Sequence, residues 1–203
     1  MNKALQITKD KGAIVEWPKL SVSLEAETKE EIKAQGAGKA ITFGISKTPF
    51  GHALFGWIKN KLCFLAFYDE NFEEKKHEMS ALWPKATLIL DDQQATKLAS
   101  TIFSDTADRV QIPIVIRGTN FQQKVWKELL ATKPSQLMSY SQLASQIGSP
   151  KAQRAVGSAL AANTIGFLIP CHRVIKGNGD VGNYRWGSSR KLAMQQWEAE
   201  LKQ

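Results

Sequence analysis

Two neighbouring residues with reactive side chains, Cys171 and His172, stand between apolar pairs in the stretch "IPCHRVI" at 169–175. A thiol becomes a nucleophile when a nearby base or cation stabilises its thiolate. Adjacent residues of an extended segment point in different directions, so the sequence alone does not place the imidazole against the sulfur. The other histidines, His52 and His77, lie far upstream, which leaves a cysteine protease as a weak interpretation.

The cysteine content argues against a metal centre. Cys63 and Cys171 are far apart, and no Cys/His cluster has the spacing of a zinc site. We therefore expect no metal and no cofactor, and reduced thiols in a cytosolic or nuclear setting, which the family resemblance described below narrows to a bacterial cytoplasm. Cys63 lies in an apolar run and is interpreted as a packing residue. No apolar run approaches the ~20 residues of a membrane span, so we expect no membrane association.

The elements that must position these residues change character near residue 117. The overall fold class is α/β plus mostly α. Residues 1–38 are polar and predict a tail or linker with one short helix, whereas residues 39–116 predict a small α/β domain with an antiparallel sheet. Within this domain the pattern predicts strands in 39–48, 52–68, 86–90 and 112–116, and helices over 73–83 and 91–104.

Residues 117–203 predict a helical domain. An amphipathic helix starts after Thr119 or Asn120, either of which is a suitable N-cap. The stretch at 139–164, "SYSQLASQIGSPKAQRAVGSALAANT", then predicts two short helices joined by a turn, the first capped by Ser139 and the second started by Pro150. This spacing is typical of a helix-turn-helix, which we expect to be winged.

Charge and side-chain size in this half leave two interpretations open. The formal net charge of the chain is +8, and the whole excess lies in residues 117–203. Such an imbalance indicates either a nucleic-acid surface or an ordinary solvated one. The second helix is almost without bulk, and Arg154 is its one long cationic side chain. Small residues favour either tight helix packing or insertion into a groove.

Several motifs carry a family resemblance. "IPCHRV", preceded by "RAVGSALAAN" and followed by "GNYRWGSSRK", closely resembles the O6-alkylguanine-DNA alkyltransferases, particularly the C-terminal part of the bacterial adaptive-response members. The resemblance is dense from "RGTNFQQKVW" at 117–126 to "WEAE" at 197–200 and looser upstream. It implies direct DNA repair by a single-turnover methyltransferase, which moves an alkyl group irreversibly from O6-alkylguanine in double-stranded DNA to its own cysteine. O4-alkylthymine stays open as a second substrate, and we expect a monomer.

The resemblance also implies roles for individual residues. Cys171 matches the alkyl acceptor, His172 the base that deprotonates it through a water, and Glu198 the carboxylate that orients the imidazole. Asn163 matches the asparagine that joins this network and connects the helix-turn-helix to the acceptor segment. Tyr140 matches the tyrosine that turns the target phosphate and donates to the leaving guanine.

DNA contact and the base pocket are implied in the same way. Arg154 matches the arginine that fills the stack after the base flips out. The DNA-binding set that we expect comprises Arg154, Tyr140, Ala155, Ser158 and Ala159. The expected substrate pocket comprises Pro170, Val174, Tyr184, Arg185, Trp186 and Lys191. Lys191 is a candidate for stabilising the thiolate, and Trp186 is either a gate against bulky alkyl groups or a packing residue.

Two other functions stay in view. One is a non-catalytic alkyltransferase-like protein that binds the same lesions, although such proteins have another residue at the acceptor position. The other is a transcription factor that uses the helix-turn-helix, for which Cys171, His172 and Glu198 would have no purpose.

Overall fold

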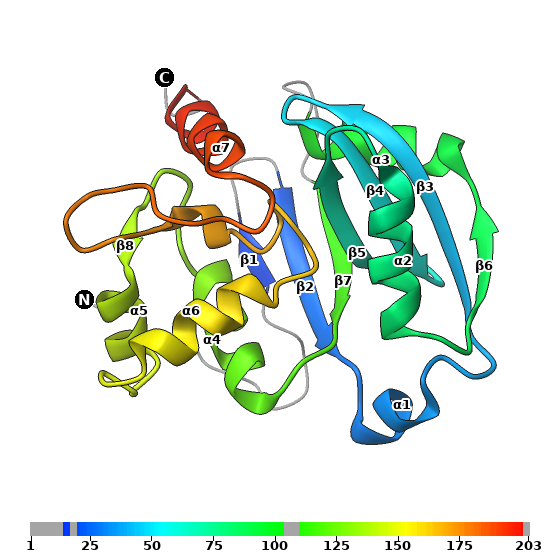
Figure 1. The fold of residues 1–203 in the computed structure, drawn as a ribbon, viewed down its shortest axis with the longest axis horizontal. Helices are drawn as coiled ribbons and strands as arrows, with labels where there is room; N and C mark the ends of the chain where they lie inside the picture. The colour runs from blue at the N-terminus through cyan, green and yellow to red at the C-terminus, as the bar shows by residue number, and fades with distance from the viewer. Residues whose placement is uncertain (1–13, 17–19, 104–109, 201–203) are drawn as a thin grey trace.

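The chain combines a seven-stranded mixed sheet with a mainly helical half, as a computed structural model shows (Figure 1). The structure describes residues 14–16, 20–103 and 110–200. The sheet has the strand order β1-β2-β7-β5-β4-β3-β6. Its strands are β1 (Ile14–Glu16), β2 (Leu20–Ala26), β3 (Ala40–Thr48), β4 (Gly51–Ile58), β5 (Lys61–Tyr68), β6 (Thr87–Leu90) and β7 (Val110–Ile116).

The prediction of an antiparallel sheet was wrong, because the sheet is mixed. The strands β3, β4 and β5 form the expected antiparallel meander through two short turns. However, β2 pairs parallel with β7, β7 with β5, and β6 with β3. Parallel neighbours need crossover connections between residues far apart in the chain, and local patterning does not report which strands such connections join.

Residues 1–38 were predicted to be a polar tail or linker, and the described part of them is not one. Leu20, Val22 and Leu24 of β2 are buried and alternate with serines, which is the pattern of a half-buried strand. The short helix expected there is α1 (Lys29–Ala34), which starts at a capping box formed by Thr28 and Glu31. Residues 1–13 and 17–19 lie outside the described part.

Two helices cover opposite faces of the sheet. The helices are α2 (Phe72–Leu82) and α3 (Asp92–Phe103), close to their predicted bounds. A Cβ added to Gly44 would meet Ala95 of α3, whereas one added to Gly56 would meet Met79 of α2. Gly56 pairs with Phe43, the neighbour of Gly44, so the two glycines face opposite sides. Both positions need glycine because the helices approach so closely.

The second half contains helices α4 (Asn120–Leu130), α5 (Tyr140–Gln146), α6 (Gln153–Ala161) and α7 (Ser188–Glu200), with a 3-10 turn, η1 (Cys171–Arg173). The predicted caps are confirmed at Thr119 and Ser139, each of which forms a capping box. Pro150 does not start α6, which begins at Gln153 after a turn. A second small sheet pairs β8 (Met138–Ser139) with β9 (Val174–Ile175) in parallel.

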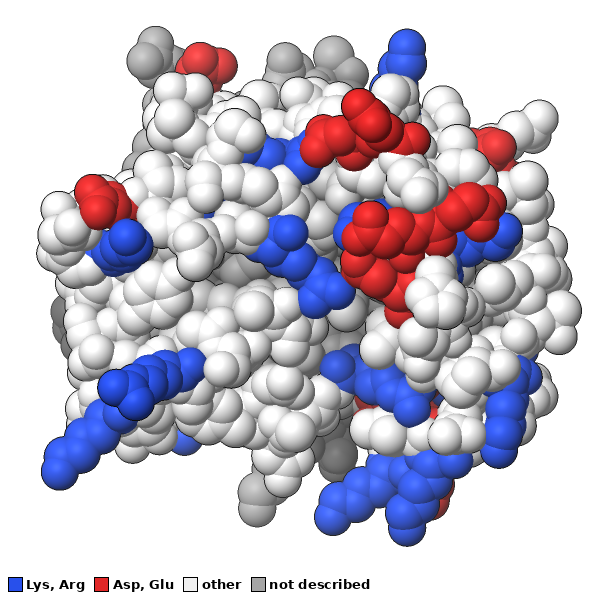
Figure 2. Space-filling model, viewed as in Figure 1, with Lys and Arg blue, Asp and Glu red and all other residues white. Residues whose placement is uncertain are grey.

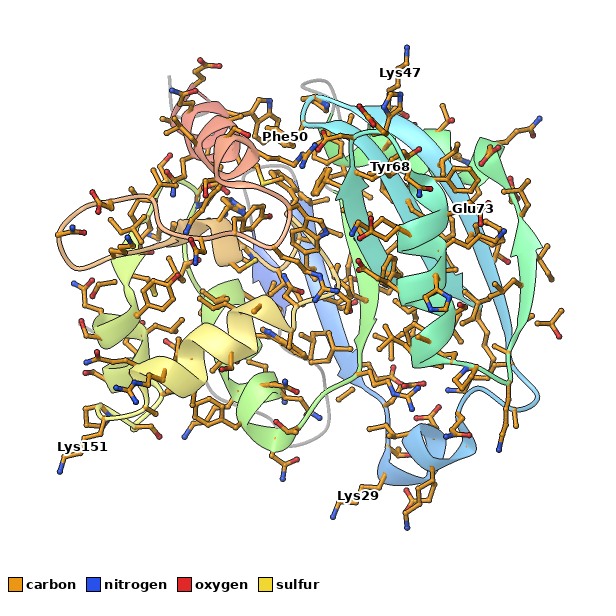
Figure 3. All side chains as sticks on the ribbon, in the orientation of Figure 1. Lys29, Lys47, Phe50, Tyr68, Glu73 and Lys151 are labelled. Carbon is orange, nitrogen blue, oxygen red and sulfur yellow. The ribbon has the colours of Figure 1, made fainter. Side chains whose placement is uncertain are left out.

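Aromatic packing joins the two halves. Phe50, in the turn between β3 and β4, contacts Phe167 and Trp197 with ring centroids 5.5 and 5.9 Å apart. Figure 3 shows Phe50 beside α7. Backbone bonds add to this joint, since Leu65 of β5 donates to the carbonyl of Thr164 at 2.9 Å and accepts from Gly166 at 2.8 Å. The sheet therefore holds the segment that leads to Cys171.

Candidate active site

Cys171 lies at the start of η1 and is 3% exposed. Asn163, which follows α6 and is fully buried, donates from Nδ2 to the sulfur at 3.2 Å. The same side chain bonds to the backbone of Ile165 and Ile169, so it fixes the segment and the sulfur together. Burial raises the pKa of the Cys171 thiol, whereas the Asn163 hydrogen bond and the charge of Lys191 lower it. The thiol is thus protonated at rest and needs a base.

His172 is paired with Glu198. Nε2 of His172 lies 2.9 Å from Oε1 of Glu198, and both residues are buried. Burial acts to raise the pKa of Glu198, but the hydrogen bonds from His172 and Arg173 and the charge of Arg173 lower it to about 2. An ionised carboxylate only accepts hydrogen bonds, so Nε2 must carry a proton. Burial lowers the pKa of His172, so the ring is neutral and the lone pair is on Nδ1.

That lone pair is available as a base. Nδ1 of His172 is buried and has no hydrogen-bond partner among the described protein atoms. Phe167 stacks on the imidazole with ring centroids 5.7 Å apart and an interplanar angle of 6°, which fixes the ring plane. The pair His172 and Glu198 therefore supplies a neutral base next to the acceptor in the chain.

Arg173 was given no role in the sequence analysis, although the structure places it in the same network. Its guanidinium donates to both oxygens of Glu198 and, through Nη1, to the carbonyl and hydroxyl oxygens of Thr132 at 2.6 and 2.8 Å. The backbone N–H of Ser135 donates to Oε2 of Glu198 at 2.8 Å. A permanent buried cation keeps this carboxylate ionised. The only sequence signal was the position of Arg173 beside His172.

A cavity of about 350 Å³ opens over the sulfur. We call it the acceptor cavity. Its walls come from the two short helices and from the loop before α7. The helices contribute Tyr140, Gly157, Leu160 and Ala161, and the loop contributes Asn183, Tyr184 and Arg185, with Cys171 completing the lining. Burial and the charge of Cys171 both raise the pKa of Tyr140, so its hydroxyl stays a hydrogen-bond donor at neutral pH.

Tyr184 and Arg185 are therefore where the predicted pocket requires them, but the other predicted pocket residues do not line this cavity. Pro170 and Val174 are buried and do not line it. Gly157, Leu160 and Ala161 were missed, because apolar and small helix residues give no sequence signal of lining a cavity rather than packing, and the loop residue Asn183 was missed as well.

Trp186 is buried, which favours packing over gating among the two roles that the sequence left open. It is 4% exposed and lines a different cavity. Its ring contacts Phe67 edge-on, with centroids 6.0 Å apart. A Cβ at Gly166 would come within 3.1 Å of the indole, which shows how tightly it is enclosed. It touches the acceptor cavity only through Tyr184, whose ring centroid is 5.2 Å away.

Lys191 holds the loop that closes the cavity. Its Nζ donates to the carbonyls of Val174, Val181 and Asn183. Burial lowers the pKa of Lys191 to about 8, and the charge of Cys171 opposes that shift. The charge of Lys191 acts to lower the pKa of the Cys171 thiol, but the hydrogen bonds of Lys191 go to backbone carbonyls and not to the sulfur.

The outer face of α6 is accessible in most of the predicted positions. Arg154, Ala155 and Ser158 are exposed. Ala159, by contrast, is 1% exposed and faces the interior, where its carbonyl accepts from Nε1 of Trp126. On the face in Figure 2, acidic side chains gather mainly over the sheet half, and few lie over the helical half. Figure 3 shows Lys151 projecting from the end of this half into solvent.

Metal and membrane features can be assessed only for the described residues. Within residues 14–16, 20–103 and 110–200, no three His, Cys, Asp or Glu residues are grouped so that they could hold a metal ion. No helix in that part of the chain is long and apolar enough to cross a membrane.

Comparison with known proteins gives a consistent set of relatives. Residues 120–200 match the family described as 6-O-methylguanine DNA methyltransferase, DNA binding domain. The chain is 35% identical over 178 residues to the bifunctional transcriptional activator/DNA repair enzyme Ada of Escherichia coli strain K12, a match that covers 85% of this chain and 49% of that protein. It is also 35% identical over 132 residues to the probable methylated-DNA–protein-cysteine methyltransferase of Acanthamoeba polyphaga mimivirus, covering 55% of this chain and 87% of that one.

A solved structure extends the similarity to the fold. Mycobacterium tuberculosis OGT, crystallised in complex with DNA, matches with a TM-score of 0.64 and 28% identity, covering 78% of this chain and 93% of that chain. The chain spans about half the length of the Ada-type relatives that it matches.

Proposed function

The chain belongs to the methylated-DNA–protein-cysteine methyltransferase family, and we propose that it repairs O6-alkylguanine in DNA by transferring the alkyl group irreversibly to Cys171. One observation carries the proposal: a buried thiol, fixed by Asn163 and followed by a neutral imidazole paired with an ionised carboxylate, forms the floor of a base-sized cavity. A cysteine that served only for packing would need neither a cavity over its sulfur nor a neighbouring base.

In the proposed reaction the thiol proton moves to Nδ1 of His172, through a water, as the family resemblance implies. The sulfur attacks the alkyl carbon, a C–S bond forms, and the bond between that carbon and O6 of the guanine breaks. The electron pair of the broken bond stays on the guanine, where Tyr140 stabilises it by donating a hydrogen bond. Glu198 stabilises the imidazolium that forms, because the 2.9 Å bond from Nε2 is already in place.

The site has no group that could remove the alkyl chain again. A thioether has a poor leaving group, and Cys63, the second cysteine, is buried in β5 away from the acceptor cavity. We therefore propose a single turnover for each protein molecule.

DNA binding follows from the same proposal. A base inside a duplex cannot present its O6 to a buried sulfur, so the target nucleotide must flip out at a cost of a few kcal/mol. We propose that α5 and α6 act as a helix-turn-helix, with the β8–β9 pair and the loop after it as a wing. The exposed small residues of α6, Ala155 and Ser158, suit the minor groove, and Arg154 would fill the space that the base leaves.

All residues that line the acceptor cavity come from one chain, and we propose that the protein acts as a monomer on DNA in a bacterial cytoplasm. O4-alkylthymine remains a candidate second substrate, since its alkyl carbon would reach the same sulfur.

A gel with labelled methylated DNA tests the function against its main alternative, the non-catalytic lesion-binding protein. Transfer of the label to the protein in a form that survives denaturation supports the alkyltransferase. Retention of the label on the DNA, with a stable complex, would support the lesion-binding protein instead.

A further inference from the structure

Arg185 lies where two cavities meet. One is the acceptor cavity, which Arg185 shares with Ala161 and Tyr184. The other, of about 450 Å³, lies between the end of β5, the start of α2 and the loop before α7. Among the described residues, Arg185 alone lines both. Its side chain therefore forms part of the wall between the site of alkyl transfer and the sheet half of the molecule.

The guanidinium of Arg185 is held from two sides. Nη1 donates to the carbonyl of Ala161, the last residue of α6, at 2.7 Å. Nη2 donates to Oε2 of Glu78 on α2 at 2.9 Å. The guanidinium carbon also lies 6.0 Å from the ring centroid of Trp186. An arginine side chain has many rotamers, and hydrogen bonds from both Nη atoms restrict it to one of them.

Glu78 is itself fixed. Its Oε1 accepts from Nζ of Lys75 at 2.6 Å, one turn earlier on α2. Burial acts to raise the pKa of Glu78, but the hydrogen bonds and charges of Lys75 and Arg185 lower it overall, so the carboxylate is ionised. The two side chains of the Arg185–Glu78 pair are only 28% and 27% exposed, which limits screening by solvent.

We propose that Arg185 determines which alkyl groups enter the acceptor cavity and that Glu78 is its positioning residue. A guanidinium fixed at the rim leaves space for a methyl group above the sulfur but obstructs a larger one. The sheet half thereby contributes to specificity through Glu78, although it supplies no atom to the reaction. This inference rests on the proposed function and assigns the size-determining role to Arg185, which lines the acceptor cavity, whereas Trp186 does not.

A different role for Arg185, as an arm that grips a DNA phosphate, fits the contacts less well. Both Nη atoms already donate, at 2.7 and 2.9 Å, to Ala161 and Glu78. A phosphate would have to approach the remaining N–H groups beside the ionised carboxylate of Glu78, which would repel it. The two roles differ in a measurable way, because a free alkylated base has no phosphate.

The test compares Glu78→Ala with Glu74→Ala as the matched control. Glu74 lies on the same helix and accepts from Lys75 at 2.9 Å, but it has no bond to Arg185. Each protein is treated with methyl and with benzyl methanethiosulfonate, which form a disulfide at a thiol and need no alkyltransferase activity. Peptide mass spectrometry gives the rate at Cys171 separately from that at Cys63.

Glu78→Ala should raise the benzyl-to-methyl rate ratio about fivefold, the effect of losing one part-buried ion pair, and Glu74→Ala should leave it unchanged. Arg185→Ala should raise it at least as much, and the double variant Glu78→Ala/Arg185→Ala no further. Arg185→Lys, which cannot hold both partners, should be intermediate. Thermal unfolding of each variant checks that it is folded. An unchanged ratio in Arg185→Lys and Glu78→Ala, or additive effects in the double variant, would overturn the proposal.

The same ratio is then measured for alkyl transfer from two free bases, O6-benzylguanine and O6-methylguanine, and the rate with an O6-methylguanine oligonucleotide is measured beside it. If Glu78→Ala and Arg185→Ala raise the benzyl-to-methyl ratio both for disulfide formation and for alkyl transfer, Arg185 limits the size of the group that enters the acceptor cavity. Slower reaction with the oligonucleotide alone would assign Arg185 to phosphate binding and overturn this rim role. If the disulfide ratio changes while no variant and no unmodified protein transfers an alkyl group, the rim role stands and the proposed function fails.

Discussion

Nε2 of His172 and Oε1 of Glu198 lie 2.9 Å apart in the buried core of the helical half, where Arg173 also binds the carboxylate. The guanidinium is the permanent charge partner of Glu198, so the imidazole does not need to be charged. Burial lowers the pKa of His172 accordingly. The resting protein therefore holds an uncharged base, ready to accept a proton when the thiol reacts.

This relationship predicts a pH dependence of stability. An unfolded histidine binds a proton as the pH falls below about 6.5, whereas His172 in the folded protein resists it. The unfolded state then binds more protons, so the free energy of unfolding should fall by up to about 1.4 kcal/mol per pH unit between about pH 6.5 and pH 5. Urea unfolding at several pH values measures it.

Two variants test the assignment. His172→Asn should flatten the dependence in this range, and His77→Asn should not, because His77 is exposed. The carboxyl of Glu198 does not contribute there, since its pKa lies at about 2 and its ordinary value is 4.5. A slope that persists in His172→Asn would mean that other groups cause it.

Arg154 should matter for duplex DNA and not for the free base. Arg154→Ala should slow transfer from O6-methylguanine in a duplex by about tenfold or more, since the space left by the flipped base is no longer filled, and leave the reaction with free O6-methylguanine unchanged. Single-turnover rates on both substrates measure this difference. Equal losses on both would make Arg154 a residue of fold stability.

Lys151 provides the matched control for Arg154, because it is an exposed cation near the start of α6 (Figure 3). Lys151→Ala should weaken binding to any duplex sequence and reduce the slope of log affinity against log salt by about one contact. The transfer rate at saturating DNA should be unaffected. A loss of that rate equal to the one in Arg154→Ala would show that charge alone explains both.

Trp186 should prove important for stability and not for selection. Trp186→Gly removes the indole packed against Phe67 and Gly166, which should lower the free energy of unfolding by about 3 to 5 kcal/mol. Trp186→Phe should lose less and leave the reactivity toward O6-benzylguanine unchanged. If Trp186→Gly were stable and reacted faster with O6-benzylguanine but not with O6-methylguanine DNA, that result would support a gating role for Trp186 instead.

Local signals predicted the local structure well. The sequence predicted the N-caps at Thr119 and Ser139 and the helix α2, because these features depend on residues only a few positions apart. The strand β2 was missed although Leu20, Val22 and Leu24 alternate with serines, because charged residues surround it. Its parallel partner β7 lies about ninety residues away, and no short-range pattern specifies such a pairing.

In the candidate site, too, the residues of local motifs were predicted and the long-range contacts were not. The motif around Cys171 predicted the acceptor and, by resemblance, its partners; the structure pairs Cys171 with Asn163 and His172 with Glu198. The bonds from Arg173 to Thr132 span 41 residues and had no sequence signal. The burial of Ala159 depends on how α6 packs on α4, which composition does not reveal.

The most direct test of the account is the mass of the protein after incubation with excess O6-methylguanine oligonucleotide. The account predicts one added methyl group, about 14 Da, located on the Cys171 peptide, with no further gain and no second turnover. Cys171→Ala should bind the same DNA and gain no mass, while Cys63→Ala should be methylated like the unmodified protein. Methylation elsewhere, methylation of Cys171→Ala, or repair of more than one lesion per protein molecule would contradict the central claim.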